Sequence, residues 1–190
     1  MNVSEAIHQR RSVGKYTAEV PSRESIEQIL AAGTRAPNHF LTQPWTFCVV
    51  AGAARAELGQ VMADRLRARK GEPQTPEEEA LLQAEAMKPQ RAPVLIAVGV
   101  RRLEHPKAKW LEEIAAGAAA VQNMLLMAEE LGLATAWRTG TYDEPGVKAY
   151  FGLGEVDHLA GVILLGYPDG TGDPKPRAPF AENTVWKGWE

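Results

Sequence analysis

The sequence has 190 residues, 45% hydrophobic and 24% charged, which favours one globular domain that needs no covalent staples. Its net charge of −3 at pH 7 argues against a general nucleic-acid or membrane-surface binder, because both need a basic surface. A single cysteine, no signal-peptide core and no apolar run near the roughly 18 residues of a membrane span together indicate a cytoplasmic protein.

The first part of the chain predicts two helices followed by a strand. Residues 3–11 are expected to form a short helix that ends on two arginines. A second helix begins at Pro21-Ser22 and continues to about Arg35, because apolar side chains recur there at helical spacing. Residues 47–51, Phe-Cys-Val-Val-Ala, predict a buried strand.

The stretch 53–90 is highly charged, and Pro73 and Pro76 interrupt it. We interpret it as two exposed helices that form a mobile lid. Residues 94–100, Val-Leu-Ile-Ala-Val-Gly-Val, follow and predict a second buried strand more strongly than the first.

The longest predicted helix covers residues 109–132, roughly 36 Å at 1.5 Å per residue. Its centre, residues 114–121, is apolar on all sides, so we expect it to be buried on more than one side. Strands are predicted at 133–137 and 159–167, with a helix near 145–150 between them.

The tail from Pro168 is rich in proline, glycine and charge and ends near Trp186 and Trp189. These two tryptophans favour a tail that wraps around another surface over a disordered one. Four or so strands among long helices, with no linker dividing residues 1–190, indicate a single α+β layered domain.

Several common catalytic and nucleotide-binding patterns are absent. The chain has no G-x-G-x-x-G or G-x-x-x-x-G-K-[ST] loop and no G-x-S-x-G nucleophile turn. Its four histidines lie far apart without metal-ligand spacing. Cys48 lies within a predicted apolar strand, which favours an inert buried thiol over a nucleophile.

Arg10-Arg11-Ser12 is the first candidate binding motif. Two guanidiniums and a hydroxyl at a helix end, with Gly14 following, suit a phosphate group, which arginine grips with two parallel hydrogen bonds. The alternative is that the arginines only complement the negative end of the helix dipole.

Three further motifs carry hydrogen-bonding groups. The loop from Arg35 through His39 to Trp45 offers donors, acceptors and apolar groups for a planar heterocycle, or is simply a proline-ordered connection with Trp45 in the core. The segment 137–140, Trp-Arg-Thr-Gly, follows a strand at a place where sheet enzymes often bind ligands, although it could merely cap the strand. Lys175-Pro-Arg177 could complete a phosphate site or form a solvated basic patch.

Together these motifs resemble the FMN-dependent nitroreductases, and most closely their compact branch of similar length. The resemblance runs along the whole chain: R-R-S, R-A-P-[ND]-H with Q-P-W, the long apolar helix, W-R-[ST]-G, a G-Y-P turn, and a closing V-x-W-x-G-W. It implies a three-layer α/β/α sandwich with a mostly antiparallel sheet and an intertwined homodimer. The stretch 53–90 would be a helical excursion, and residues 168–190 an arm that reaches the partner subunit.

The resemblance also implies a set of FMN-binding residues: Arg10, Arg11, Ser12, Arg35, His39, Trp137, Arg138, Thr139, Gly140, Lys175 and Arg177. By analogy Arg10 and Ser12 hold the phosphate, aided by Arg177 and Lys175 of the tail. Arg11 would lie near the ribityl and pyrimidine side. The loop residues Arg35 and His39 would come from the partner subunit. The backbone at 139–140 would approach flavin N5, with the two preceding side chains forming part of that wall.

Two positions depart from the family pattern. Many relatives carry a basic residue in place of Gly14, and larger relatives have asparagine in place of Leu41, so contacts to the flavin pyrimidine could differ. The implied activity is ping-pong transfer of hydride from NADH or NADPH through flavin N5 to a nitroaromatic, quinone or other small organic acceptor, without a side-chain acid or base or a metal. The alternatives are another reduction or dehydrogenation on the same fold, and a non-catalytic FMN store.

Overall fold

The computed structural model describes residues 1–170 and 176–189. Its centre is a four-stranded sheet in the order β1-β2-β4-β3, with every neighbouring pair antiparallel. The strands are β1 (Trp45–Ala51), β2 (Val94–Val100), β3 (Ala134–Arg138) and β4 (His158–Gly166). The predicted α+β class and the antiparallel sheet are therefore confirmed, and β2 has the bounds expected from its run of apolar residues.

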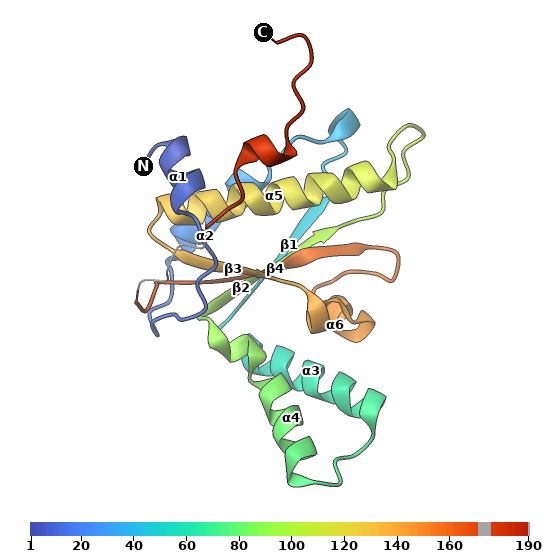
Figure 1. Ribbon diagram of the computed structural model, residues 1–190. Helices are drawn as coiled ribbons and strands as arrows, with labels where there is room; N and C mark the ends of the chain where they lie inside the picture. The colour runs from blue at the N-terminus through green and yellow to red at the C-terminus, as the bar shows by residue number, and fades with distance from the viewer. Residues whose placement is uncertain (171–175, 190) are drawn as a thin grey trace.

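Helices cover both faces of the sheet (Figure 1). On one face α5 packs across the strands, with α2 and α1 against it; on the other α3 contacts β1 and α6, and α4 packs on α3. The described helices are α1 (Val3–Gln9), α2 (Arg23–Gly33), α3 (Ala54–Lys70), α4 (Pro76–Ala86), α5 (Trp110–Glu130) and α6 (Pro145–Tyr150), with short 3₁₀ turns η1 (His39–Leu41), η2 (Lys88–Arg91), η3 (Gly140–Asp143) and η4 (Phe180–Asn183).

Alternation along β2 explains the three layers. Every residue of this strand is buried, and successive side chains of a strand point to opposite faces. Val94, Ile96 and Val98 join the core beneath α5, whereas Leu95 and Ala97 join the core beneath α3. A strand that is apolar at every position thus holds helices on both sides.

The long helix α5 lies where the 109–132 pattern placed it, one or two residues shorter at each end. Small residues let it approach the sheet: a Cβ at Gly117 would collide with the side chain of Val100. One side of α5 faces the sheet and another contacts α2, in agreement with the prediction that it is buried on more than one side. Leu111 and Ala115 remain exposed on its outer side.

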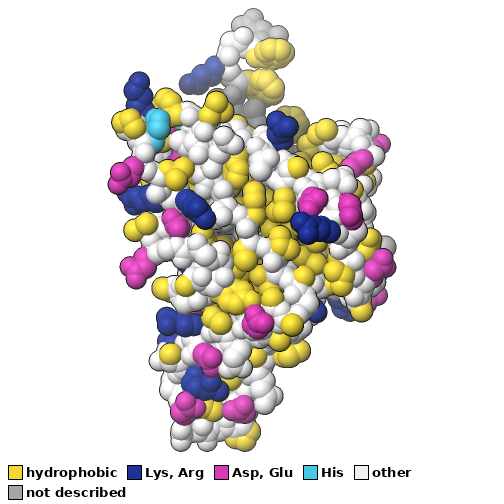
Figure 2. All heavy atoms as spheres, turned by 180° about the vertical axis from the view of Figure 1, so that it is seen from behind, with side chains coloured by type: hydrophobic (Ala, Val, Ile, Leu, Met, Phe, Trp, Pro, Cys, Tyr) yellow, Lys and Arg dark blue, Asp and Glu magenta, His cyan; other side chains and the backbone are white. Residues whose placement is uncertain are grey.

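The charged stretch contains the two predicted helices, but α3 is less exposed than expected. Leu58 and Met62 of α3 belong to the core on that face of the sheet, and Arg69 forms an ion pair of 2.8 Å with Glu144 just before α6. On the face drawn in Figure 2, charged side chains of both signs lie at the end of the molecule formed by α3 and α4. Apolar side chains gather across the middle of the same face. Movement of these helices as a lid stays a prediction.

The segment that carries η4 runs past α5 and then away from the body of the chain (Figure 1). All of residues 176–189 are exposed, including Phe180 and the two tryptophans, whose rings lie 6.0 Å apart. Within the described residues, no helix is long and apolar enough to cross a membrane.

Candidate functional site

The Arg10-Arg11-Ser12 motif lies beside the start of β3. Arg10 is the residue at which α1 ends, and its backbone N–H donates to the carbonyl of Ala6. Ser12 forms a parallel bridge with Thr135, and the backbone N–H of Val13 donates to the Thr135 carbonyl at 2.9 Å. This pairing fixes the motif to the outer edge of the sheet.

Arg11 carries a buried donor without an acceptor. Its Nε has no hydrogen-bond partner among the described residues, while its Nη1 donates to the Gln9 carbonyl at 3.2 Å. Buried polar groups are nearly always hydrogen-bonded, so an orphaned guanidinium N–H is suited to donate a hydrogen bond to an oxygen of a ligand. The side chain lines a hollow of about 220 Å³ together with Val13, Gly132, Leu133 and Pro168.

The Trp137–Gly140 motif lies at the opposite end of the same strand. The Trp137 indole N–H donates to the carbonyl of Ala160 at 3.0 Å. The ring occupies the space above Gly161, where any Cβ would overlap the indole. Thr135 and Arg138 are three residues apart on β3, about 10 Å at 3.3 Å per residue, so the two motifs lie along one sheet edge.

A hollow of about 400 Å³ opens beside this motif, within the size range of small-molecule sites. It is lined by Lys88, Arg91, Arg138, Thr139, Gly140, Thr141, Tyr142 and Leu164. The Lys88 ammonium donates to the carboxylate of Glu85 and to the Thr141 hydroxyl, the latter at 3.2 Å. Glu85 is 7% exposed, and its second oxygen has no partner among the described residues.

The hollow is positively charged. The side chains of Arg91 and Arg138 form no hydrogen bond or ion pair with another residue in the described part of the chain. Burial raises the pKa of Tyr142 to about 12, although the nearby guanidiniums of Arg91 and Arg138 oppose the shift and the Glu85 carboxylate adds to it. Tyr142 is therefore protonated at neutral pH. The charge of Lys88 is offset by Glu85, and the two arginines give the hollow an affinity for anionic groups.

Sequence reasoning missed Lys88 and Arg91. They belong to η2, where the charged stretch 53–90 ends, two residues before the buried strand β2. Side chains three residues apart lie on the same side of a 3₁₀ turn. A lysine and an arginine three residues apart, just before a predicted buried strand, are therefore the sequence pattern by which these two residues could have been predicted.

The loop 38–43 is strained. Phe40, Leu41 and Gln43 have φ values of +55°, +53° and +48°, a left-handed region that costs non-glycine residues roughly 1–2 kcal/mol each. Such strain persists where surrounding contacts over-determine the backbone, and it is concentrated at functional sites. Here Asn38 Oδ1 accepts a hydrogen bond from the Gln43 backbone N–H at 3.0 Å.

His39 lies far from Arg11 within one chain. Its Nδ1 is 3.0 Å from a carboxylate oxygen of Glu112 in the first turn of α5, which leaves Nε2 available to a ligand. Arg11 shares its hollow with Glu129 near the end of α5. The 17 residues from Glu112 to Glu129 rise about 26 Å, too far for one small ligand to contact both groups in a single chain.

The remaining predicted site residues are dispersed. Arg35 lines a third hollow, of about 410 Å³, between α1, α2 and α5. Arg177 lies on the exposed arm, and Lys175 lies outside the described residues. The structure thus places the motifs at 10–12 and 137–140 along one edge of the sheet, whereas His39 lies apart from Arg11 and Arg35 lines a different hollow.

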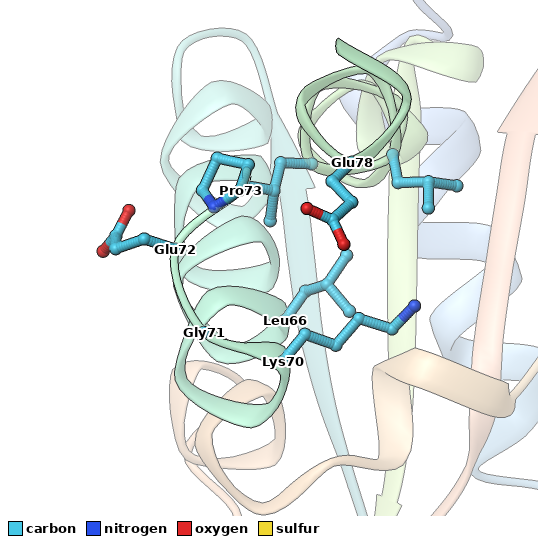
Figure 3. Close-up of a pocket in the computed structure, with 8 residues that line it drawn as sticks. Leu66, Lys70, Gly71, Glu72, Pro73 and Glu78 are labelled. Carbon is cyan, nitrogen blue, oxygen red and sulfur yellow. The ribbon is translucent and has the colours of Figure 1, made fainter. Parts of the chain in front are cut away.

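Three other features were considered as sites: a small cavity, the cysteine thiol and clusters of metal-binding side chains. A cavity of about 30 Å³ between α3 and α4, where Leu66, Lys70 and Glu78 meet (Figure 3), is far below the ~300–1,000 Å³ of small-molecule pockets. Cys48 is part-buried rather than fully buried as expected, and this burial raises the pKa of its thiol, which disfavours the thiolate. The described residues contain no cluster of side chains suited to a metal ion.

Comparison with known proteins assigns most of the chain to one family. A family model described as "Nitroreductase family" matches residues 7–167. "Putative NAD(P)H nitroreductase YdjA" of Escherichia coli K12 is 32% identical over 170 residues, which are 88% of this chain and 89% of that protein. "Putative NAD(P)H nitroreductase YfhC" of Bacillus subtilis is 31% identical over 179 residues, covering 93% of this chain and 89% of its own.

Solved structures have the same fold. A nitroreductase-like family protein from Bacillus cereus superposes with a TM-score of 0.80 at 26% identity, over 99% of this chain and 97% of its own. A nitroreductase with bound FMN from Bacteroides fragilis gives a TM-score of 0.74 at 26% identity, over 98% of this chain and all of its own. The family model and the relatives cover most of the chain, and the chain therefore belongs to the nitroreductase family.

Proposed function

We propose that this protein is an FMN-dependent NAD(P)H oxidoreductase that works as a homodimer. The observation that carries the proposal is the line of groups along the edge of β3. It runs from the unpartnered guanidinium N–H of Arg11 to the cationic hollow beside Gly140. The relative from Bacteroides fragilis, which binds FMN, and those named as NAD(P)H nitroreductases support the choice of cofactor and reductant.

The residues at the start of β3 fit a phosphate group. Arg10, Arg11 and Ser12 supply two guanidiniums and a hydroxyl, and the buried Nε of Arg11 lacks an acceptor that a phosphate or ribityl oxygen would provide. Arg177 and Lys175 are proposed to add charge from the tail. The donor set is that of an anion site and contains no carboxylate at the motif itself.

The residues at the end of β3 fit the flavin ring. When bound, FMN would take hydride at N5 from NAD(P)H and pass it, in a ping-pong cycle, to a nitroaromatic, quinone or other small organic acceptor. Trp137 and the backbone of Thr139 and Gly140 would form the wall against the ring. Lys88 and Arg91 would hold positive charge near the pyrimidine edge, and so offset the absence of a basic residue at Gly14.

A second subunit would supply the missing part of the site. Glu112, which pairs with His39, and Glu129, which lines the hollow beside Arg11, are about 26 Å apart along α5, so one chain cannot place both His39 and Arg11 on one FMN. The outer side of α5 exposes Leu111, and the arm exposes Phe180, Trp186 and Trp189. Exposed apolar surface of this extent is typical of an interface, and we propose that a second copy covers it.

Anaerobic reduction tests whether the protein is an enzyme or a flavin store. The purified holoprotein is mixed with NADH or NADPH without oxygen, and the visible flavin absorbance is followed. We expect bleaching by at least one of the two nucleotides, and recovery of the absorbance when a quinone or nitroaromatic is added. A bound flavin that neither nucleotide reduces would contradict the enzymatic proposal and leave a storage role.

A further inference from the structure

Glu113 is a buried carboxylate that the proposed chemistry does not use. It lies in the first turn of α5 and is 4% exposed. Its Oε1 accepts a hydrogen bond of 2.7 Å from the Thr42 hydroxyl, and its Oε2 has no partner among the described residues. Burying a carboxylate without a cation costs free energy, so stability alone does not account for a carboxylate at this position.

Thr42 belongs to the strained loop 38–43. A run of left-handed residues in the loop needs contacts from outside to hold it. Phe40 stacks on His105 with ring centroids 4.9 Å apart, and the start of α5 provides the other external contacts. The Thr42 hydroxyl also lies 3.2 Å from the His39 carbonyl, but its single proton favours the shorter, charge-assisted bond to Glu113.

The neighbouring Glu112 provides the weaker of the two anchors. It pairs with His39, and the two side chains are 30% and 62% exposed, so water and salt screen the pair. The bond between Thr42 and Glu113 is part-buried and therefore less screened. The positive end of the α5 dipole favours both carboxylates.

We infer that Glu113 is a positioning residue for the loop 38–43. From the buried start of α5 its carboxylate fixes Thr42, and through Thr42 the backbone that carries His39. Only the last step rests on the proposed function: because His39 is proposed to face the FMN bound mainly by the second subunit, release of the loop weakens FMN binding by the dimer.

Four single variants separate positioning from stability. Glu113→Leu removes both the anchor and the buried charge, and Thr42→Val removes the same bond from the loop side. Glu113→Gln keeps an oxygen that accepts the Thr42 proton and is the conservative rescue. Glu112→Gln is the matched control on the exposed neighbour.

Hydrogen exchange measures the loop itself. We expect the Gln43 amide, which donates to Asn38, to exchange about tenfold to a hundredfold faster in Glu113→Leu and Thr42→Val, the range expected for loss of one charge-assisted hydrogen bond. Glu113→Gln and Glu112→Gln should stay within about threefold of the wild type. The melting temperature of Glu113→Leu should be unchanged or higher, the opposite of what a purely structural residue gives.

FMN affinity measures the last step. The dissociation constant should rise by about tenfold in Glu113→Leu and Thr42→Val, and no further in the double variant, because both changes remove one interaction. Unchanged exchange at Gln43 overturns the inference, and should Glu113→Leu not fold, Thr42→Val decides. Faster exchange with unchanged FMN affinity overturns the link to the site. A wild-type protein that binds no FMN refutes the proposed function, and the exchange data still decide whether Glu113 holds the loop.

Discussion

The indole of Trp137 lies directly over Gly161, on the neighbouring strand β4. The indole N–H donates to the carbonyl of Ala160 at 3.0 Å, and a Cβ at position 161 would overlap the ring. Gly161 also has a φ of +151°, which side chains rarely adopt. The absence of a side chain at Gly161 therefore fixes the position of the Trp137 ring, which is proposed to form part of the flavin site.

Gly161→Ala should therefore displace Trp137. We expect a loss of roughly 1–3 kcal/mol in the free energy of unfolding, because the added methyl group forces the ring or the strand to move. Chemical denaturation measures the loss. Gly14→Ala is the matched control, since no atom lies within 4 Å of a Cβ there and its φ is not positive. Equal stability of the two variants would show that the indole moves aside freely.

Lys88→Met should destabilise the protein through Glu85. The change leaves a carboxylate that is 7% exposed without its cation. Because the Lys88 side chain itself is 31% exposed and water screens the pair, we expect a loss of about 1–3 kcal/mol. Adding Glu85→Gln removes the charge and should restore most of the stability. If Lys88→Met alone unfolds at the same denaturant concentration as the wild type, the ion pair between Lys88 and Glu85 does not stabilise the folded protein.

Arg10→Ala separates a phosphate contact from a helix cap. If Arg10 binds the FMN phosphate, a charge-assisted hydrogen bond of roughly 1.5–3 kcal/mol is lost, and FMN binds about ten- to a hundredfold more weakly. Riboflavin lacks the phosphate and should bind almost as before. Fluorescence titration of the apoprotein with both flavins measures the difference, with exposed Arg23→Ala as the control.

Equal losses for the two flavins, or no loss for FMN, would mean that Arg10 is structural. A cap alone contributes roughly 0.3–1 kcal/mol to stability and leaves flavin affinity unchanged. The comparison is decisive because the two ligands differ only in the phosphate group.

Stability should fall at alkaline pH because of Tyr142. Its pKa is raised to about 12 in the folded chain, mainly by burial, whereas an unfolded tyrosine ionises near 10. Above about pH 10 the unfolded state loses the proton first, so the free energy of unfolding decreases as pH rises, by about 1.4 kcal/mol at pH 11. Below pH 10 this contribution is fully present. Denaturation of the wild type and Tyr142→Phe between about pH 9 and 11 measures it, and parallel curves would contradict the shift.

Much of the fold could be predicted because the apolar runs are unambiguous. Residues 94–100 form a strand buried on both faces, and the 109–132 pattern gives α5 to within two residues. The burial of α3 could not be predicted in the same way. Leu58, Met62 and Leu66 recur at helical spacing, but charged residues flank them along the helix, and the sequence does not show that β1 lies beneath them.

The site was predicted less completely, because its parts are distant in sequence. The bridge between Ser12 and Thr135 brings together motifs separated by more than a hundred residues, and only family resemblance linked them in advance. Lys88 and Arg91 were missed because they join the site only through the folding of η2 against the segment around Gly140, where all three residues line one hollow. The placement of His39 beside Glu112 follows from the packing of the loop on α5, which no local pattern reveals.

The most direct test of the account is the chromophore of the purified protein. Acid precipitation should release a yellow supernatant with the spectrum of FMN, at close to one FMN per 20.7 kDa chain, and light scattering of the holoprotein should give about twice that mass. FAD in place of FMN, no chromophore even after reconstitution with FMN, or a folded monomer that holds FMN alone would contradict a flavin site shared between two subunits.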